Sequence, residues 1–180
     1  MSISTESETN IKTWLNTRQL EVPPDFISQA ARYLDIILDW SARLNLVSRN
    51  DLDNLVERHL LDSLTPIDEI PDDGNLADIG SGAGFPAIPI ALFRPKLNIV
   101  MIESRGKKAE FLNEAISILG LNNIAIWQGR LEEFSPSFQF DILTIRGVSI
   151  SEKIEKHLRR ISRDSGKIIY YDKFNSYKLL

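Results

Sequence analysis

Apolar residues recur every three or four positions in the first third of the chain, which is the spacing of amphipathic helices. This pattern predicts helices over residues 11–20 and 24–44, and a third from Ser48 or Asn50 to Thr65. The apolar face of the third helix would consist of Leu52, Leu55, Val56, Leu60 and Leu64. We therefore expect residues 1–66 to form an N-terminal helical arm.

From residue 76 onward the period changes, and short apolar runs alternate with helical stretches. The predicted strands are residues 76–79, 98–103, 124–127, 140–145 and 167–171, and the predicted helices are 86–93, 107–119 and 151–161. Gly120 is typical of a helix C-cap, and Ser165-Gly166 of a turn. This alternation predicts an α/β fold in residues 67–180, with a doubly wound, mostly parallel sheet and helices on both faces.

The composition excludes several classes of protein and several kinds of functional site. With 180 residues, 43% hydrophobic and 26% charged, the chain is long enough for one globular domain and is neither disordered nor collagenous. It has no cysteine and two histidines, so we expect no disulfide and no metal site. The net charge of -4 argues against non-specific coating of nucleic acid and leaves room for a local basic patch.

The sequence also bears on location. No apolar run reaches the ~18 residues that span a bilayer, and the first ten residues lack the features of a secretory signal. We expect a cytoplasmic protein with no membrane segment.

A glycine-rich loop follows the first predicted strand. Asp78, Gly80, Gly82 and Gly84 form the pattern D-x-G-x-G-x-G, whereas a dinucleotide-binding fingerprint would need glycine where Phe85 stands. A P-loop is excluded because no Lys-Ser/Thr pair follows. The pattern is typical of methyltransferases that use S-adenosylmethionine (AdoMet), and its alternative is a merely structural turn.

Glu103 ends the second predicted strand, 19 residues after Gly84. An acid at this place can accept hydrogen bonds from both hydroxyls of a ribose. The alternative is an exposed charge at a strand end.

Several segments occur together in a characteristic order. They are Arg58-His-Leu-Leu-Asp-Ser-Leu64, the glycine loop through Phe85-Pro86, Ile102-Glu-Ser-Arg-Gly-Lys-Lys108, Arg130-Leu-Glu-Glu133, and Phe140-Asp141 leading to Arg146. Over about residues 25–150 the chain resembles the bacterial small-subunit ribosomal RNA guanine-N7 methyltransferases, also called the glucose-inhibited division protein B family.

The chain departs from the family pattern at three places. Ala87 stands where the family usually has glycine, and Ile145-Arg146-Gly147 replaces Ser-Arg-Ala. Residues 167–174 replace an expected strand that ends in Lys-Gly, and the chain stops where the family continues into closing antiparallel strands. We therefore expect an incomplete set of C-terminal strands.

The resemblance implies a cofactor, AdoMet, and residues that would hold it. Gly80 and Phe85 would line its methionine side, and Leu131 and Glu132 would contact its adenine. Arg146 would face the cofactor carboxylate or the RNA. The alternatives are a first-turn acid for Glu132 and a structural ion pair, for instance with Glu132, for Arg146.

The resemblance also implies a substrate, a guanine of 16S ribosomal RNA or of the small ribosomal subunit. RNA-binding candidates are Arg58, Arg105, Lys107, Lys108 and Arg146. The alternatives are a solvated helix start for the cluster at 105–108, and a helical ion pair of Arg58 with Asp62 beside a satisfied His59.

No catalytic acid or base is expected, because guanine N7 carries a lone pair and no proton. The protein would bring the base close to the methyl group and align the two. We expect the protein to be a monomer. Two other functions stay open: an AdoMet-dependent methyltransferase of a small molecule, and a non-catalytic domain that binds AdoMet or RNA.

Overall fold

The computed structural model describes residues 5–180, and it describes Thr5 and Glu6 by their backbone alone. A six-stranded sheet has the order β3-β2-β1-β4-β5-β6, in which only the last pair is antiparallel. The strands are β1 (Asp73–Ile79), β2 (Lys96–Glu103), β3 (Ile124–Gln128), β4 (Phe140–Arg146), β5 (Ser162–Lys173) and β6 (Ser176–Leu179). The doubly wound, mostly parallel sheet is thus confirmed.

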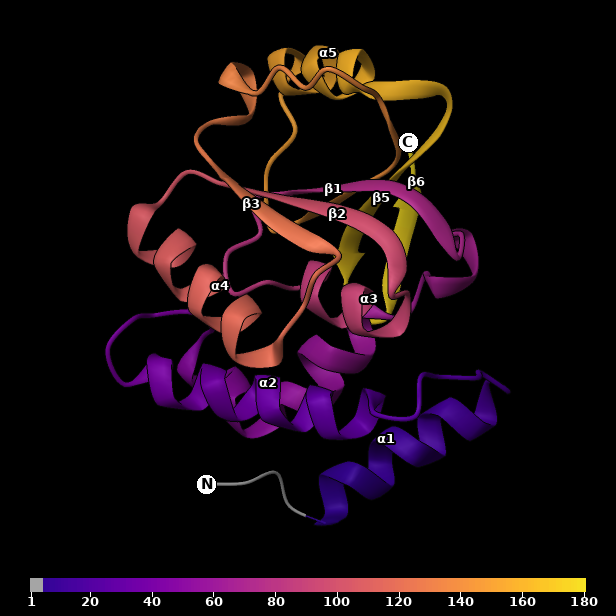
Figure 1. Cartoon of the computed structure of the whole chain (residues 1–180), viewed down its shortest axis with the longest axis vertical. Helices are drawn as coiled ribbons and strands as arrows, with labels where there is room; N and C mark the ends of the chain where they lie inside the picture. Colours follow the sequence, from indigo (N-terminus) through magenta and orange to yellow (C-terminus); the bar gives the residue numbers. More distant parts are fainter. Residues whose placement is uncertain (1–4) are drawn as a thin grey trace.

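Side chains alternate along each strand, so the sheet has two apolar faces. In β2, Leu97, Ile99 and Met101 belong to one hydrophobic cluster, and Ile102 belongs to the other. Figure 1 shows α5 (Glu152–Ile161) on one face of the sheet and the other helices on the opposite face. They are α1 (Thr5–Thr17), α2 (Phe26–Ser41), α3 (Ala87–Phe93) and α4 (Gly106–Leu119).

The helices of the predicted arm pack onto the sheet unit through buried apolar residues. Phe26 and Trp40 of α2 contact Phe93 and Phe111 edge to face, and all four belong to one hydrophobic cluster. The first helix begins earlier than predicted, at Thr5, and ends at Thr17 because Gln19 adopts a left-handed backbone (φ 53°). Residues 1–4 of the predicted arm lie outside the described residues.

The third helix was predicted as one regular α-helix, and this prediction is wrong. The structure has a 3₁₀ helix, η1 (Arg49–Asn54), followed by a π-helical turn, η2 (Val56–Leu61). Buried apolar residues in η2 lie at positions 56, 60 and 61, and this face packs against α1. A π-turn rotates the side chains that follow it, and such turns are frequent at functional sites.

The C-terminal segment also differs from the prediction. Ser165-Gly166 is not a turn that separates elements, because it lies inside β5, at a bulge where Phe140 pairs with Ser162 but Ile142 with Lys167. After a two-residue turn, Phe174-Asn175, the unpredicted strand β6 runs back along β5. Asn175 supplies the left-handed residue of that turn (φ 55°).

Candidate active site

The three loop glycines meet different neighbours at the carboxyl end of β1, and all have positive φ. A Cβ on Gly80 would lie 2.6 Å from Val148, and one on Gly84 would lie 2.8 Å from the Tyr33 hydroxyl. A Cβ on Gly82 would make ordinary van der Waals contacts, with Lys108 Nζ nearest at 3.6 Å. Gly84 therefore packs on α2, while Gly80 and Gly82 face the edge of the sheet.

Glu103 holds the glycine loop to the neighbouring strand. Its carboxylate accepts hydrogen bonds from the backbone N–H of Gly82 (2.8 Å) and of Arg105 (2.7 Å). The residue is only 5% exposed, so the alternative of an exposed strand-end charge is wrong. Since a carboxylate has about four acceptor positions, about two stay open for a ligand.

Asp78 lies beneath the loop and is buried. The Thr144 hydroxyl donates to Oδ1 (2.7 Å), whereas Oδ2 has no hydrogen-bond partner among the described residues. Burial raises the pKa of Asp78 to about 6. The Thr144 hydroxyl thus fixes the Asp78 carboxylate beneath the loop, and its role toward a cofactor stays a prediction.

A pocket of about 220 Å³ lies beside the glycine loop, at the carboxyl ends of β1 to β3. We call it the glycine-loop pocket, and its lining is Ile79, Gly80, Ile102, Ser104, Gly129, Arg130, Leu131, Glu132, Val148 and Ile154. Leu131 and Glu132 belong to the 3₁₀ helix η4 (Leu131–Glu133). The structure thus places three of the predicted cofactor residues in one pocket.

Glu132 is the acidic side chain of this pocket. A hydrogen bond from its own backbone N–H, with a further contribution from Lys153 at 3.7 Å, lowers its pKa. Its carboxylate is therefore ionised at neutral pH and can accept hydrogen bonds.

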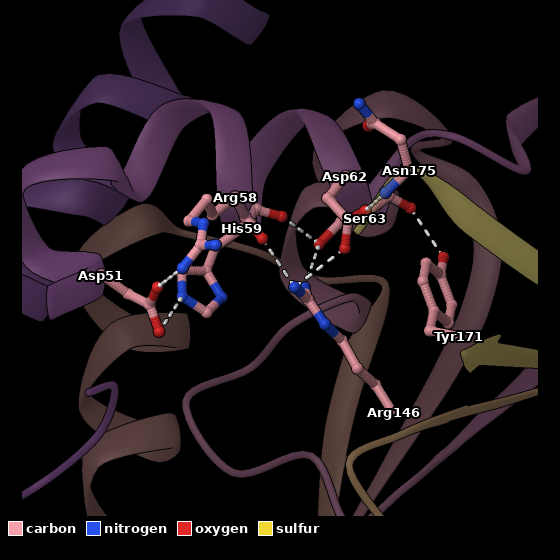
Figure 2. Close-up of polar contacts among 8 residues, drawn as sticks. All are labelled: Asp51, Arg58, His59, Asp62, Ser63, Arg146, Tyr171 and Asn175. Atoms are coloured by element: carbon pink, nitrogen blue, oxygen red, sulfur yellow. Dashed lines mark hydrogen bonds and ion pairs between the residues drawn. The ribbon is translucent and has the colours of Figure 1, made fainter. Parts of the chain in front are cut away.

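A second pocket, of about 280 Å³, lies on the other side of the Arg146–Val148 turn. We call it the ion-pair pocket, and its lining is Asp51, Arg58, His59, Asp62, Arg146, Gly147, Tyr171, Asp172, Lys173 and Phe174. Figure 2 shows the Arg146 side chain reaching from the end of β4 to the segment that carries Arg58, Asp62 and Ser63.

Arg146 and Asp62 form the central ion pair, with Nη2 and Oδ2 2.8 Å apart. Arg146 also donates to the backbone carbonyl of Arg58 (2.6 Å), and Asp62 accepts from the backbone N–H of Asn175 (2.6 Å). Burial raises the pKa of Asp62, and Arg146 opposes this shift. The network joins η2, β4 and the β5–β6 turn.

The two ion pairs that were the alternatives to a functional role for Arg146 and Arg58 form with other partners. Arg146 pairs with Asp62 and not with Glu132, because Glu132 lies in the other pocket. Arg58 pairs with Asp51 (2.6 Å) and not with Asp62, because the π-turn separates the two side chains.

His59 lies between the ion-pair pocket and the glycine loop. Its ring stacks on Phe85, with centroids 5.0 Å apart, and Phe85 in turn contacts Tyr33. Burial, with Arg146 nearby, lowers the pKa of His59 to about 4, so the ring is neutral at pH 7. Phe85 is thus buried behind His59 and outside the lining of both pockets.

The basic cluster lies at the start of α4. Arg105 precedes the helix, Lys107 and Lys108 occupy its first turn, and no acidic residue accompanies them there. Cations are unfavourable at a helix N-terminus, so helix stability does not explain this arrangement.

Comparison with known proteins identifies the family of this chain. Residues 26–176 match the model of the family described as rRNA small subunit methyltransferase G. The chain belongs to this family. It is 38% identical over 145 residues to ribosomal RNA small subunit methyltransferase G of Nitrosomonas europaea, covering 79% of this chain and 67% of that protein. The Helicobacter pylori J99 protein of the same name is 39% identical over 139 residues, covering 77% and 78%.

A solved structure supports the same fold for this member of the methyltransferase G family. A putative S-adenosyl-L-methionine-dependent methyltransferase of Methanococcus maripaludis superimposes with a TM-score of 0.60 and 19% identity, covering 79% of this chain and 64% of that one. At that identity the likeness shows the fold.

Sequence reasoning missed the C-terminal half of the ion-pair pocket. Tyr171, whose hydroxyl donates to the Ser63 carbonyl (2.7 Å), lines the pocket together with Asp172, Lys173 and Phe174. An available signal was the cluster of aromatic and basic residues after the last predicted strand. Among the side chains that the structure describes, no group of three or more acidic or histidine residues could hold a metal ion, and no helix of the described part is long and apolar enough to cross a membrane.

Proposed function

We propose that the protein transfers the methyl group of AdoMet to N7 of a guanine in small-subunit (16S) ribosomal RNA. The observation that carries the proposal is the pair of pockets that meet at the Arg146–Val148 turn, in a chain of the methyltransferase G family. One pocket adjoins the glycine loop, and the other presents cations and a neutral histidine.

The glycine-loop pocket suits AdoMet by its shape and its donors and acceptors. Gly80 lets Val148 pack directly against the loop backbone at the rim of this pocket, since a Cβ there would lie 2.6 Å from the Val148 side chain. Glu103 has acceptor positions left for the ribose hydroxyls, and Leu131 and Glu132 offer backbone and carboxylate groups to an adenine. When bound, AdoMet supplies an electrophilic methyl group.

The ion-pair pocket suits the target base. Guanine N7 needs no deprotonation before it attacks a methyl carbon, so the protein's task is to hold the base in line with the methyl group. Arg58 and Arg146 can donate to a guanine oxygen or to phosphate, and neutral His59 can donate or accept at its ring nitrogen.

The remaining surface would bind the rest of the RNA. In this proposal, Arg105, Lys107 and Lys108 contact phosphates, and residues 1–66 act as a helical arm on the unit formed by residues 67–180. The protein would act in the cytoplasm, since bacterial ribosomal RNA is cytoplasmic.

The test is an incubation of the protein with methyl-labelled AdoMet and either 16S RNA or small ribosomal subunits. Digestion should release labelled 7-methylguanosine from the small-subunit RNA and none from large-subunit RNA, which serves as the control. Label in a small molecule, or AdoMet binding without transfer to either RNA, would contradict the proposal.

A further inference from the structure

Phe174 is a large apolar side chain at the mouth of the ion-pair pocket. It is 50% exposed and occupies the two-residue turn between β5 and β6. The preceding residues Ile168, Ile169 and Tyr171 of β5 are buried, whereas Leu179 and Leu180 at the end of the chain are exposed like Phe174. Phe174 instead lines a pocket whose other side chains are mostly charged.

The backbone on both sides of Phe174 is fixed to the protein. The N–H of Asn175 donates to the buried Asp62 carboxylate (2.6 Å), and the Tyr171 hydroxyl donates to the Ser63 carbonyl (2.7 Å). Lys173 and Ser176 pair across the turn. The backbone that carries the ring is therefore held in place by contacts that do not involve the ring itself.

The charges near Phe174 favour an anionic partner. Asp172 pairs with Lys178 (2.8 Å), Asp51 with Arg58, and Asp62 with Arg146. Lys173 lies in the same pocket and forms no salt bridge with any side chain that the structure describes, and its neighbour Asp172 already pairs with Lys178. An exposed aromatic ring beside an unpaired lysine is the combination that binds unpaired nucleotides, since bases stack on the ring and phosphates meet the cation.

We propose that Phe174 is a stacking platform for an unpaired base of the substrate RNA at the mouth of the ion-pair pocket, with Lys173 holding the adjoining phosphate. This inference rests on the proposed function, because it takes RNA as the partner of that pocket. It adds a specificity determinant: the RNA must present a single-stranded base next to or at the target guanine.

The test compares Phe174→Ala with Phe138→Ala, a matched control. Phe138 is equally exposed, at 47%, and lies near the junction of α5 and β5, away from both pockets. Phe174→Ala should weaken binding of a single-stranded 16S RNA fragment and raise the KM for RNA about tenfold, with kcat and AdoMet affinity unchanged. Phe174→Trp should restore the parental KM, and Phe138→Ala should match the parent.

Two further measurements, binding of paired RNA and sedimentation of the protein, distinguish base stacking from other roles of Phe174. A fully paired duplex of the same fragment should bind the parent and Phe174→Ala alike, because its bases are not free to stack. Equal KM values for Phe174→Ala and Phe138→Ala, or a Phe174→Ala defect that appears only as a lost dimer in sedimentation, would overturn the inference. Methylation by the parent tests the proposed function separately, so failure of the two ideas can be told apart.

Discussion

The two pockets of the carboxyl edge are built in different ways. The glycine-loop pocket is formed by residues that directly follow β1, β2 and β3, and its shape depends on backbone conformation at Gly80 and on the Glu103 clamp. The ion-pair pocket joins side chains from η1, η2, β4 and the segment around the β5–β6 turn, and they range from Asp51 to Phe174 along the chain. Backbone geometry governs the first pocket, and buried charges govern the second, so different perturbations should damage them.

The largest effect should come from Asp62→Ala, which leaves Arg146 without its partner and Asn175 N–H without its acceptor. We expect a loss of about 3 kcal/mol in the free energy of unfolding, measured by urea denaturation. The control Asp68→Ala removes an exposed pair with Arg18 and should cost less than about 1 kcal/mol. Equal losses in the two variants would show that the ion pair does not organise its pocket.

Gly80→Ala should lower the free energy of unfolding by about 2 kcal/mol, because strain in the left-handed backbone adds to a clash with Val148. It should also weaken AdoMet binding more than about tenfold. The control Gly120→Ala has the same sign of φ (66°) and nothing within 4 Å of its Cβ. In this variant only the backbone strain should lower the free energy of unfolding, by about 1 kcal/mol, and the AdoMet affinity should stay unchanged. Calorimetry with AdoMet checks both, and unchanged affinity in Gly80→Ala would contradict the cofactor assignment.

Asp78→Asn should show how much the buried Asp78 carboxylate lowers the free energy of unfolding as the pH rises. The pKa of Asp78 is about 6 in the fold, above its value near 3.9 in the unfolded chain, so its contribution is most favourable below pH 4 and is lost as pH rises through 6. The stability of Asp78→Asn relative to the parent should therefore rise by about 2 kcal/mol between pH 4 and pH 7. Urea denaturation across that range checks it, and a difference independent of pH would refute it.

The smallest effect should come from Lys107→Ala with Lys108→Ala. RNA affinity should fall several-fold and the salt dependence of binding should become shallower, while AdoMet affinity stays unchanged. The free energy of unfolding should rise by up to about 1 kcal/mol, since two cations leave the first turn of α4. Lys12→Ala with Lys96→Ala is the control of equal charge. Equal RNA affinity of both double variants would mean that the RNA surface lies elsewhere.

Much of the fold and of the glycine-loop pocket followed from local patterns. A hydrophobic period depends on residues two to four positions apart, and the loop glycines and Glu103 are defined by their distance from strand ends. Seven of the eight elements predicted from residue 76 onward lie where they were expected, within about three residues, and the eighth, β5, is longer than predicted. Gly120 caps its helix with a left-handed backbone as predicted.

The partners of Arg58 and Arg146 were decided by the tertiary structure. The sequence spacing of Arg58 and Asp62 suggests a helical ion pair, but this segment is a π-turn whose Val56 and Leu60 are buried, and Arg58 pairs with Asp51 instead. Arg146 then reaches Asp62, and the turn at Phe174-Asn175 closes over the same carboxylate. A local pattern carries no information on which distant segments meet, because the free energy that selects these pairs comes from burial and from contacts formed only in the folded chain.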